Sequence, residues 1–178
     1  MTDSTLRTLK NLRQSRQFDG QAIDEADLNT ILEIARWSGS SRNGQPWQLV
    51  VVDDREQLKR LANVRELNQW MDNAAVAIAI VLPGNSNVSH AYDEGRLSQR
   101  VMLAADVLGF GSGTAWYTTD EEKAAAKEIL GIPADETLRS LVVIGRVADE
   151  PKSAGKAGAG RKPMTEIVSY NRFGDRAR

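Results

Sequence analysis

The sequence predicts an α/β or α+β sandwich formed by one domain, residues 1–178. Apolar residues make up 41% of the chain and charged residues 26%, which is the composition of a globular protein with a buried core. Amphipathic helices and apolar strands also alternate along most of the chain, as they do where helices cover a sheet. Because no internal repeat divides the 178 residues, we expect one domain.

Helices are predicted where apolar residues recur three or four positions apart. In 24–37, Asp24 is a good N-cap, and Leu28 and Ile31 share one face. In 5–14, three leucines are spaced three apart and Ser4 is the predicted N-cap. Further helices are predicted over 54–63, 66–72, 91–108, 120–130 and 163–170.

The longest predicted helix, 91–108, contains two alanines on its apolar face that would let another helix approach closely. We expect Asp93 and Glu94 to be acids of its first turn, and His90 to be a surface or cap residue. The glycine-rich run 109–113 that follows is predicted to stop the helix and to turn the chain.

Four apolar stretches predict strands, at 47–52, 75–82, 115–117 and 141–147. Each is bounded by polar residues, glycine or proline. The segment after the last strand differs, because it is rich in glycine, alanine and positive charge. We interpret this segment as an arm and not as a second domain.

Composition excludes several classes of chemistry. The chain has no cysteine, so it has no disulfide, thiolate nucleophile or cysteine-ligated metal. His90 is its only histidine, and no G-x-S-x-G motif marks a serine nucleophile. An enzyme of this composition would depend on carboxylates or on a cofactor.

Charge and hydropathy bear on partners and location. A net charge of −1 gives no electrostatic reason to expect nucleic acid or an anionic membrane as a partner. The longest apolar run, 74–82, is too short to span a bilayer. The polar N-terminus lacks a signal-peptide core, so we expect a cytoplasmic protein.

Two polar segments are candidates for ligand binding. Arg13-Gln14-Ser15-Arg16 places two guanidinium groups three residues apart, where they could share one anion, although a solvated helix face has the same pattern. The second segment is a loop with hydroxyl and amide side chains that suit a heterocycle, or that simply connect helix and strand. Its candidate residues are Ser40, Ser41, Asn43 and Gln45.

Two further segments are candidates for a phosphate or a cofactor. Gly111-Ser112-Gly113 could present bare backbone N–H groups to a ligand, or could form only a turn. It follows a predicted helix, so it is not a Rossmann fingerprint. Arg161 and Lys162 in the basic arm are either late-arriving phosphate ligands or part of a solvated tract.

Together and in order, these segments resemble the FMN-dependent nitroreductase family over nearly the whole chain. The resemblance lies in 12–18, in the S-x-x-N-x-Q-P-W signature at 40–47, in 92–112 and in 161–168, which is similar to the family's C-terminal R-x-P-L-x-E segment. Leu12, Gln14 and Gly39 depart from residues that are frequent in the family, which puts the phosphate shell and the cofactor loop in question.

The resemblance implies a three-layer α/β/α sandwich with a mostly antiparallel central sheet. It also implies an obligate, intertwined homodimer whose FMN sites lie at the subunit interface, with the C-terminal arm 148–178 extending over the partner subunit. Arg13 and Arg161 would hold the phosphate, with Lys162 nearby, and Arg16 would lie near N1 and O2 of the flavin. Ser40 and Asn43 would contact the cofactor, and Gly111, Ser112 or Gly113 would donate near N5.

The implied reaction is a ping-pong transfer of hydride from NADH or NADPH, through flavin N5, to a small electrophilic acceptor such as a nitroaromatic or a quinone. No protein side chain is expected to be catalytic. Two alternatives stay open at this point: a flavoenzyme of the same fold that dehydrogenates or dehalogenates a specific metabolite, and a flavin-binding protein without turnover. The sequence does not indicate the acceptor or the preferred nicotinamide.

Overall fold

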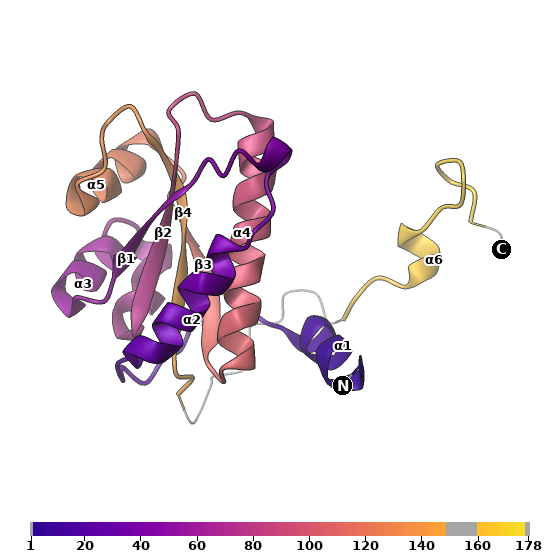
Figure 1. The fold of residues 1–178 in the computed structure, drawn as a ribbon, viewed down its shortest axis with the longest axis horizontal. Helices are drawn as coiled ribbons and strands as arrows, with labels where there is room; N and C mark the ends of the chain where they lie inside the picture. Colours follow the sequence, from indigo (N-terminus) through magenta and orange to yellow (C-terminus); the bar gives the residue numbers. More distant parts are fainter. Residues whose placement is uncertain (1, 149–159, 177–178) are drawn as a thin grey trace.

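The computed structural model describes residues 2–148 and 160–176, in which a four-stranded sheet lies between two layers of helices (Figure 1). The strand order is β1-β2-β4-β3, and every neighbouring pair is antiparallel. The strands are β1 (Gln48–Val52), β2 (Val76–Leu82), β3 (Gly111–Trp116) and β4 (Thr137–Gly145).

The helices divide between the two faces of the sheet. The face with α2 and α4 and the face with α3, η2 and α5 each have their own buried apolar cluster. The helices are α1 (Thr2–Asn11), α2 (Glu25–Arg36), η1 (Ser41–Asn43), α3 (Arg55–Asn63), η2 (Glu66–Asn73), α4 (Val88–Val107), α5 (Asp120–Leu130) and α6 (Met164–Ile167).

Strand β2 shows why the fold has three layers. Its seven residues are all buried, so the strand reads as a continuous apolar run and not as an alternating one. Ala77 and Ala79 belong to the cluster under α3, whereas Ile78 and Ile80 belong to the cluster under α4. The side chains alternate between two cores because successive residues of a strand point to opposite faces.

Helix α4 begins earlier than the apolar spacing predicts. Asn87 accepts a hydrogen bond from the backbone of His90, whose side chain accepts one in return from the backbone of Asn87, so the helix starts at Val88. The expected cap role of His90 is confirmed. The expectation that Asp93 and Glu94 are first-turn acids is wrong, because both lie further along the helix and are buried.

The glycine-rich run after α4 is only partly a turn. Gly109 adopts a φ of +83° and ends the helix, but β3 then begins at Gly111, four residues before the predicted strand. Glycine is a weak strand former, so its propensity gave no signal for a strand here. The early start has a packing reason, which is described with the site below.

The helices at the two ends of the chain differ from their predictions: α1 has the predicted length but begins three residues before 5–14, and α6 is shorter. Ser4 lies inside α1 and is not its N-cap. α6 covers only four residues of the predicted 163–170, and the residues between 66 and 73 form a 3₁₀-helix. α6 lies away from the sheet, beyond α1 (Figure 1). Most of the basic tract before Arg161 lies outside the described residues.

Tyr117→Phe tests a buried polar contact that joins β3 to α3. The Tyr117 hydroxyl donates to the carbonyl oxygen of Leu61 at 3.0 Å, and burial raises the pKa of the phenol, which keeps it protonated. We expect a loss of about 1 kcal/mol in the free energy of unfolding, because the carbonyl oxygen of Leu61 loses its hydrogen bond from Tyr117 and keeps the longer one from the backbone N–H of Val64, at 3.3 Å. Urea unfolding measures this loss. Tyr92→Phe, at a largely exposed tyrosine, is the control, and an equal loss in both variants would contradict the expectation.

Candidate cofactor site

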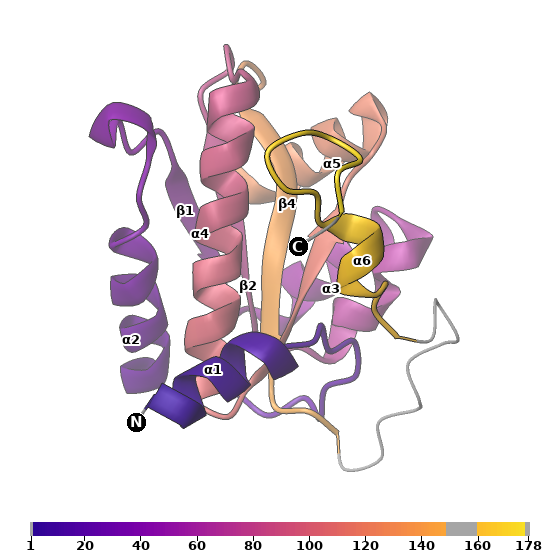
Figure 2. The ribbon, with the colours of Figure 1, turned by 90° about the vertical axis from the view of Figure 1, so that its right-hand side faces the viewer.

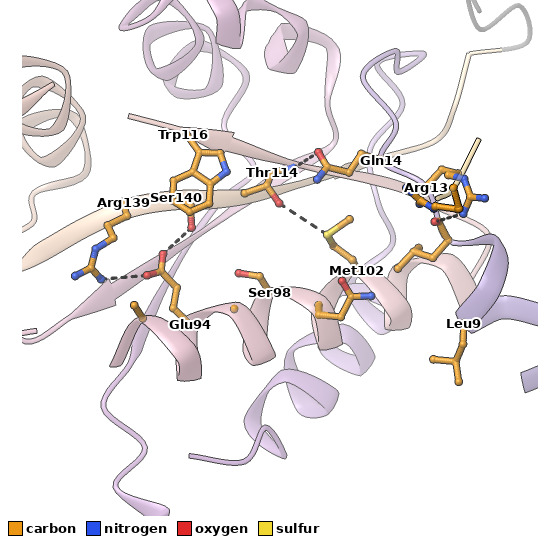
Figure 3. A pocket seen from close by; sticks show the side chains of 15 residues that line it. Leu9, Arg13, Gln14, Glu94, Ser98, Met102, Thr114, Trp116, Arg139 and Ser140 are labelled. Carbon is orange, nitrogen blue, oxygen red and sulfur yellow. Dashed lines mark hydrogen bonds and ion pairs between the residues drawn. The ribbon is translucent and has the colours of Figure 1, made fainter. Parts of the chain in front are cut away.

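The segment 13–16 lies along the free edge of β3 and continues the sheet for a short distance. The backbone N–H of Ser15 donates to the carbonyl oxygen of Ser112 at 2.7 Å, and Gln14 forms a parallel bridge with Ser112. The side-chain oxygen of Gln14 also accepts from the backbone N–H of Thr114 at 3.3 Å (Figure 3). These contacts with β3 therefore fix the backbone positions from which the side chains of Arg13 and Arg16 extend.

Gly111 and Gly113 make this approach possible because they lack side chains. A Cβ atom at Gly113 would lie 2.7 Å from the carbonyl oxygen of Ser15, and one at Gly111 would lie 2.8 Å from the Ser15 side chain. In the structure these glycines pack against the arginine segment and pair with β4. Their role as N–H donors to a ligand stays a prediction. The buried Ser112 hydroxyl has no hydrogen-bond partner among the residues described.

A cleft of about 680 Å³ opens beside this segment, between α1, α4 and the sheet (Figure 3). Arg13 and Arg161 both line it, although they come from opposite ends of the chain. Arg13 donates to the carbonyl oxygens of Lys10 and Leu12 at 2.9 and 2.8 Å, which holds its guanidinium at the C-terminal end of α1. Lys162 is the exposed neighbour of Arg161. Arg13 and Arg161 thus line the same cleft, and their shared binding of one phosphate stays a prediction.

Arg16 faces a different cleft, of about 350 Å³, on the other side of the segment. Its guanidinium carbon lies 5.6 Å from the centre of the Trp70 ring, within the range of a cation–π interaction. Trp70 also lies against Phe18, with 6.1 Å between the ring centres. The four-residue segment therefore offers one arginine to each of two neighbouring clefts.

The second predicted group, Ser40, Ser41, Asn43 and Gln45, forms a tight loop around η1. Arg42, Asn43 and Gln45 have φ angles of 52°, 55° and 44°, in the left-handed region that costs a non-glycine residue about 1–2 kcal/mol. Within the loop, the Ser40 hydroxyl accepts from the backbone N–H of Gln45 at 2.9 Å. The backbone N–H of Ser41 donates to a carboxylate oxygen of Asp93 on α4 at 3.0 Å.

The structure does not bring the two predicted groups together within one chain. The loop lies beside Asp93, near the start of α4, whereas the segment 13–16 lies at the level of Met102 and Thr114. Nine residues of helix separate Asp93 from Met102, which is about 13 Å. Figure 2 shows the loop and α1 at opposite ends of α4. Within one chain, the two predicted groups therefore lie near different ends of α4.

Sequence reasoning missed a polar cluster in the first cleft. Glu94 is 4% exposed and accepts from the Ser140 hydroxyl at 2.7 Å and from Arg139 at 3.2 Å (Figure 3). Trp116, which is half exposed, lines the same cleft. Periodicity could not find this cluster because its members come from α4, β3 and β4. The one sequence feature that could have indicated the cluster is the pair Asp93 and Glu94 on an otherwise apolar face of α4.

Two further properties concern the part of the chain that the structure describes. In residues 2–148 and 160–176, no cluster of three or more acidic or histidine side chains forms a candidate metal site. Over the same ranges, no helix combines the length and apolar character that a membrane crossing needs.

Comparison with known proteins identifies the family. The profile of the Nitroreductase family matches residues 9–66. A relative from Archaeoglobus fulgidus, named for NADH dehydrogenase or NAD(P)H nitroreductase activity, is 32% identical over 83% of this chain and 88% of its own length. An FMN-dependent nitroreductase from Clostridium difficile R20291 has a TM-score of 0.81 at 25% identity, over 94% of this chain and 99% of that chain.

The comparisons also confirm the predicted fold class. Nitroreductase A from Vibrio parahaemolyticus has a TM-score of 0.83 over 97% of this chain and 77% of its own, at 24% identity. The layers and the antiparallel sheet are therefore those of a known fold. Because the archaeal relative matches most of both chains, this chain belongs to the nitroreductase family.

Proposed function

We propose that this protein is an FMN-dependent oxidoreductase that takes electrons from NADH or NADPH and passes them to a small electrophilic acceptor, such as a nitroaromatic or a quinone. The observation that carries the proposal is that Arg13 and Arg161 line one cleft, beside the segment that bears Arg16. When bound, FMN supplies the chemistry by accepting hydride at N5 and donating it after the nicotinamide has left. The family membership supports this assignment.

The residues present fit the phosphate end of FMN. Guanidinium groups bind phosphate oxygens in pairs and keep their charge at any physiological pH. Arg13 is held by two carbonyl oxygens, so part of the cost of ordering its side chain is met before the phosphate arrives. Arg161 brings a second charge from the arm, and Lys162 stands beside it. We assign these three residues to the phosphate.

The residues around Arg16 fit the flavin ring. Arg16 is held over the Trp70 ring, which fixes a positive charge beside the segment 13–16. A fixed positive charge near N1 and O2 favours the reduced, anionic flavin. In the proposed dimer, the exposed amides of Asn43 and Gln45 would come from the loop of the other subunit, and they can both donate and accept hydrogen bonds, as the flavin edge requires. The protein then binds and orients FMN without a catalytic side chain of its own.

The separation of the two groups supports a homodimer with shared sites. In a twofold dimer, the loop 40–45 of one subunit can lie beside the segment 13–16 of the other, which completes two equal sites. Leu9, Trp116, Met164, Ile167 and Phe173 are large apolar side chains that are about half exposed or more, and in this proposal the partner subunit covers them. In this proposal the arm 148–178 extends over the partner subunit.

Reduction of the bound cofactor tests the proposed activity. We expect anaerobic NADH or NADPH to bleach the visible absorption band of the protein reconstituted with FMN. Turnover on quinones and nitro compounds should follow. Bleaching without turnover on any such acceptor would favour a flavoenzyme for one specific metabolite. Absence of bleaching with both donors would reject the proposal, and failure to bind FMN would remove its basis.

Arg13→Gln and Arg161→Gln test the phosphate site. Each removes a charge-assisted contact, so we expect the Kd for FMN to rise about 10- to 100-fold in either variant. Quenching of flavin fluorescence on titration of the apoprotein measures the Kd. Arg60→Gln makes the same charge change at an exposed position of α3, on the other side of the sheet. The assignment fails if all three variants bind FMN alike.

Gly113→Ala tests the contact between β3 and the arginine segment. The new methyl group would lie 2.7 Å from the carbonyl oxygen of Ser15, so this segment must move away from the sheet. We expect the Kd for FMN to rise about 10-fold or more, because Arg13 and Arg16 move with it. The control is Gly39→Ala, since a Cβ there meets nothing within 4 Å. Equal affinity in the two variants would contradict the expectation.

A further inference from the structure

The loop 40–45 holds an intrinsically unfavourable backbone conformation. Three of its residues have positive φ angles, and none of the three is glycine. Such conformations persist only where surrounding contacts enforce them. The other hydrogen bonds of residues 40–45 that the structure describes connect residues of the same loop. The strained conformation of the loop therefore requires a contact between the loop and the rest of the protein.

The contact that joins this loop to the body is made by Asp93. Its Oδ2 accepts from the backbone N–H of Ser41 at 3.0 Å, across 52 positions of sequence. Its Oδ1 accepts from Arg96, one turn along α4, at 3.1 Å. Asp93 is 1% exposed, whereas the Arg96 side chain is 60% exposed. A buried carboxylate is costly unless it is paired, so its two contacts fix where it points.

The same contact determines which groups of the loop remain available to a ligand. Asp93 occupies the backbone N–H of Ser41, and Gln45 donates to the Ser40 oxygen, so the Ser40 hydroxyl keeps its hydrogen for another acceptor. The Asn43 side chain is exposed and has no hydrogen bond within the described part of the chain. The loop thus presents one hydroxyl donor and one amide outward.

We propose that Asp93 is a positioning residue for the cofactor: its carboxylate anchors the loop 40–45 so that Ser40 and Asn43 are held ready for FMN. The inference rests on the proposed function for the identity of the ligand. The anchoring itself does not require FMN. Asp93 acts through the backbone of Ser41 and touches neither the cofactor nor the substrate.

Two pairs of variants separate this role from a general effect on folding. Asp93→Ala removes the acceptor, whereas Arg96→Gln removes the other partner of the same carboxylate and leaves the Ser41 contact in place. Ser41→Pro removes the N–H donor without changing Asp93, and proline is well tolerated at the first position of a helical turn. Ser41→Ala keeps that N–H and serves as its control.

The first readout is the Kd for FMN of the full-length apoprotein, measured by flavin fluorescence. We expect Asp93→Ala and Ser41→Pro each to weaken binding about 10- to 100-fold, and the double variant to be little worse than either single variant. Asp93→Asn should recover most of the affinity because its amide oxygen can accept from Ser41. Arg96→Gln should stay within a few-fold of the wild type, and Ser41→Pro should bind more weakly than Ser41→Ala, which loses only the hydroxyl.

The second readout needs no cofactor. Amide hydrogen exchange of the flavin-free protein should speed up in residues 40–45 of Asp93→Ala, while α4 and the sheet keep their protection. If Asp93→Ala does not fold, Ser41→Pro is compared with Ser41→Ala instead. The Kd for FMN and the hydrogen exchange of residues 40–45 then test the anchoring.

The proposal is overturned if Asp93→Ala and Ser41→Pro bind FMN like the wild type, if their effects add, or if Arg96→Gln weakens binding equally. Unchanged exchange in the loop would also overturn it. Failure of the wild type to bind FMN would instead refute the proposed function, and the exchange experiment would then test the anchoring by itself.

Discussion

The length of α4 is the constraint on which the rest of the structure depends. Twenty helical residues hold their ends about 30 Å apart, and the buried contacts of the helix with the sheet keep it in place. The loop 40–45 is attached near one end, and the segment 13–16 lies near the other. No movement of a side chain can bring these groups together in one subunit. The homodimer proposed above would let the loop of a second subunit complete the site.

Two neighbouring acids on α4 connect the helix to different parts of the molecule. Glu94 binds Ser140 and Arg139 on β4, so it fastens the helix to the sheet. Asp93 points to the loop and binds Ser41. Each carboxylate is buried and paired, so each holds its partner in one orientation as well as in contact with α4. One helix thereby sets the position of the loop relative to the sheet, where the arginine segment is attached.

The sequence predicted the helices and strands that are determined by residues close together in the chain. α5 occupies 120–130 as expected, because Thr119 and Glu122 form a capping box and Gly131 ends the helix with a φ of +66°. β2 was predicted within one residue because an unbroken apolar run has few alternatives. The start of β3 was not predictable, since its glycines are explained by Ser15, nearly one hundred residues away.

In the candidate site too, features that depend on neighbouring residues were predicted, and features that depend on distant residues were not. The segment 13–16, the loop 40–45 and the arm were each identified from their residue types, but only the resemblance to a family connected them. Asp93 and Glu94 were placed on the correct helix and in the wrong environment, because their partners Ser41 and Arg139 are distant in sequence. Burial of a polar side chain depends on such partners, and helical periodicity carries no information about them.

The amino-acid composition explains why the residues of the candidate site are suited to bind and orient a ligand and not to react with it. With no cysteine and a single histidine that caps a helix, the described residues offer few groups that react themselves. Arginines fixed by carbonyl oxygens or by an aromatic ring, and a strained loop held by a buried acid, are suited instead to hold a bound molecule in one orientation. In the proposed function, selectivity for an acceptor would then arise from the walls of the clefts. Trp116 and the pair Glu94–Arg139 line the first cleft and are not among the residues assigned to the phosphate, so their shape and charge are available for contact with an acceptor.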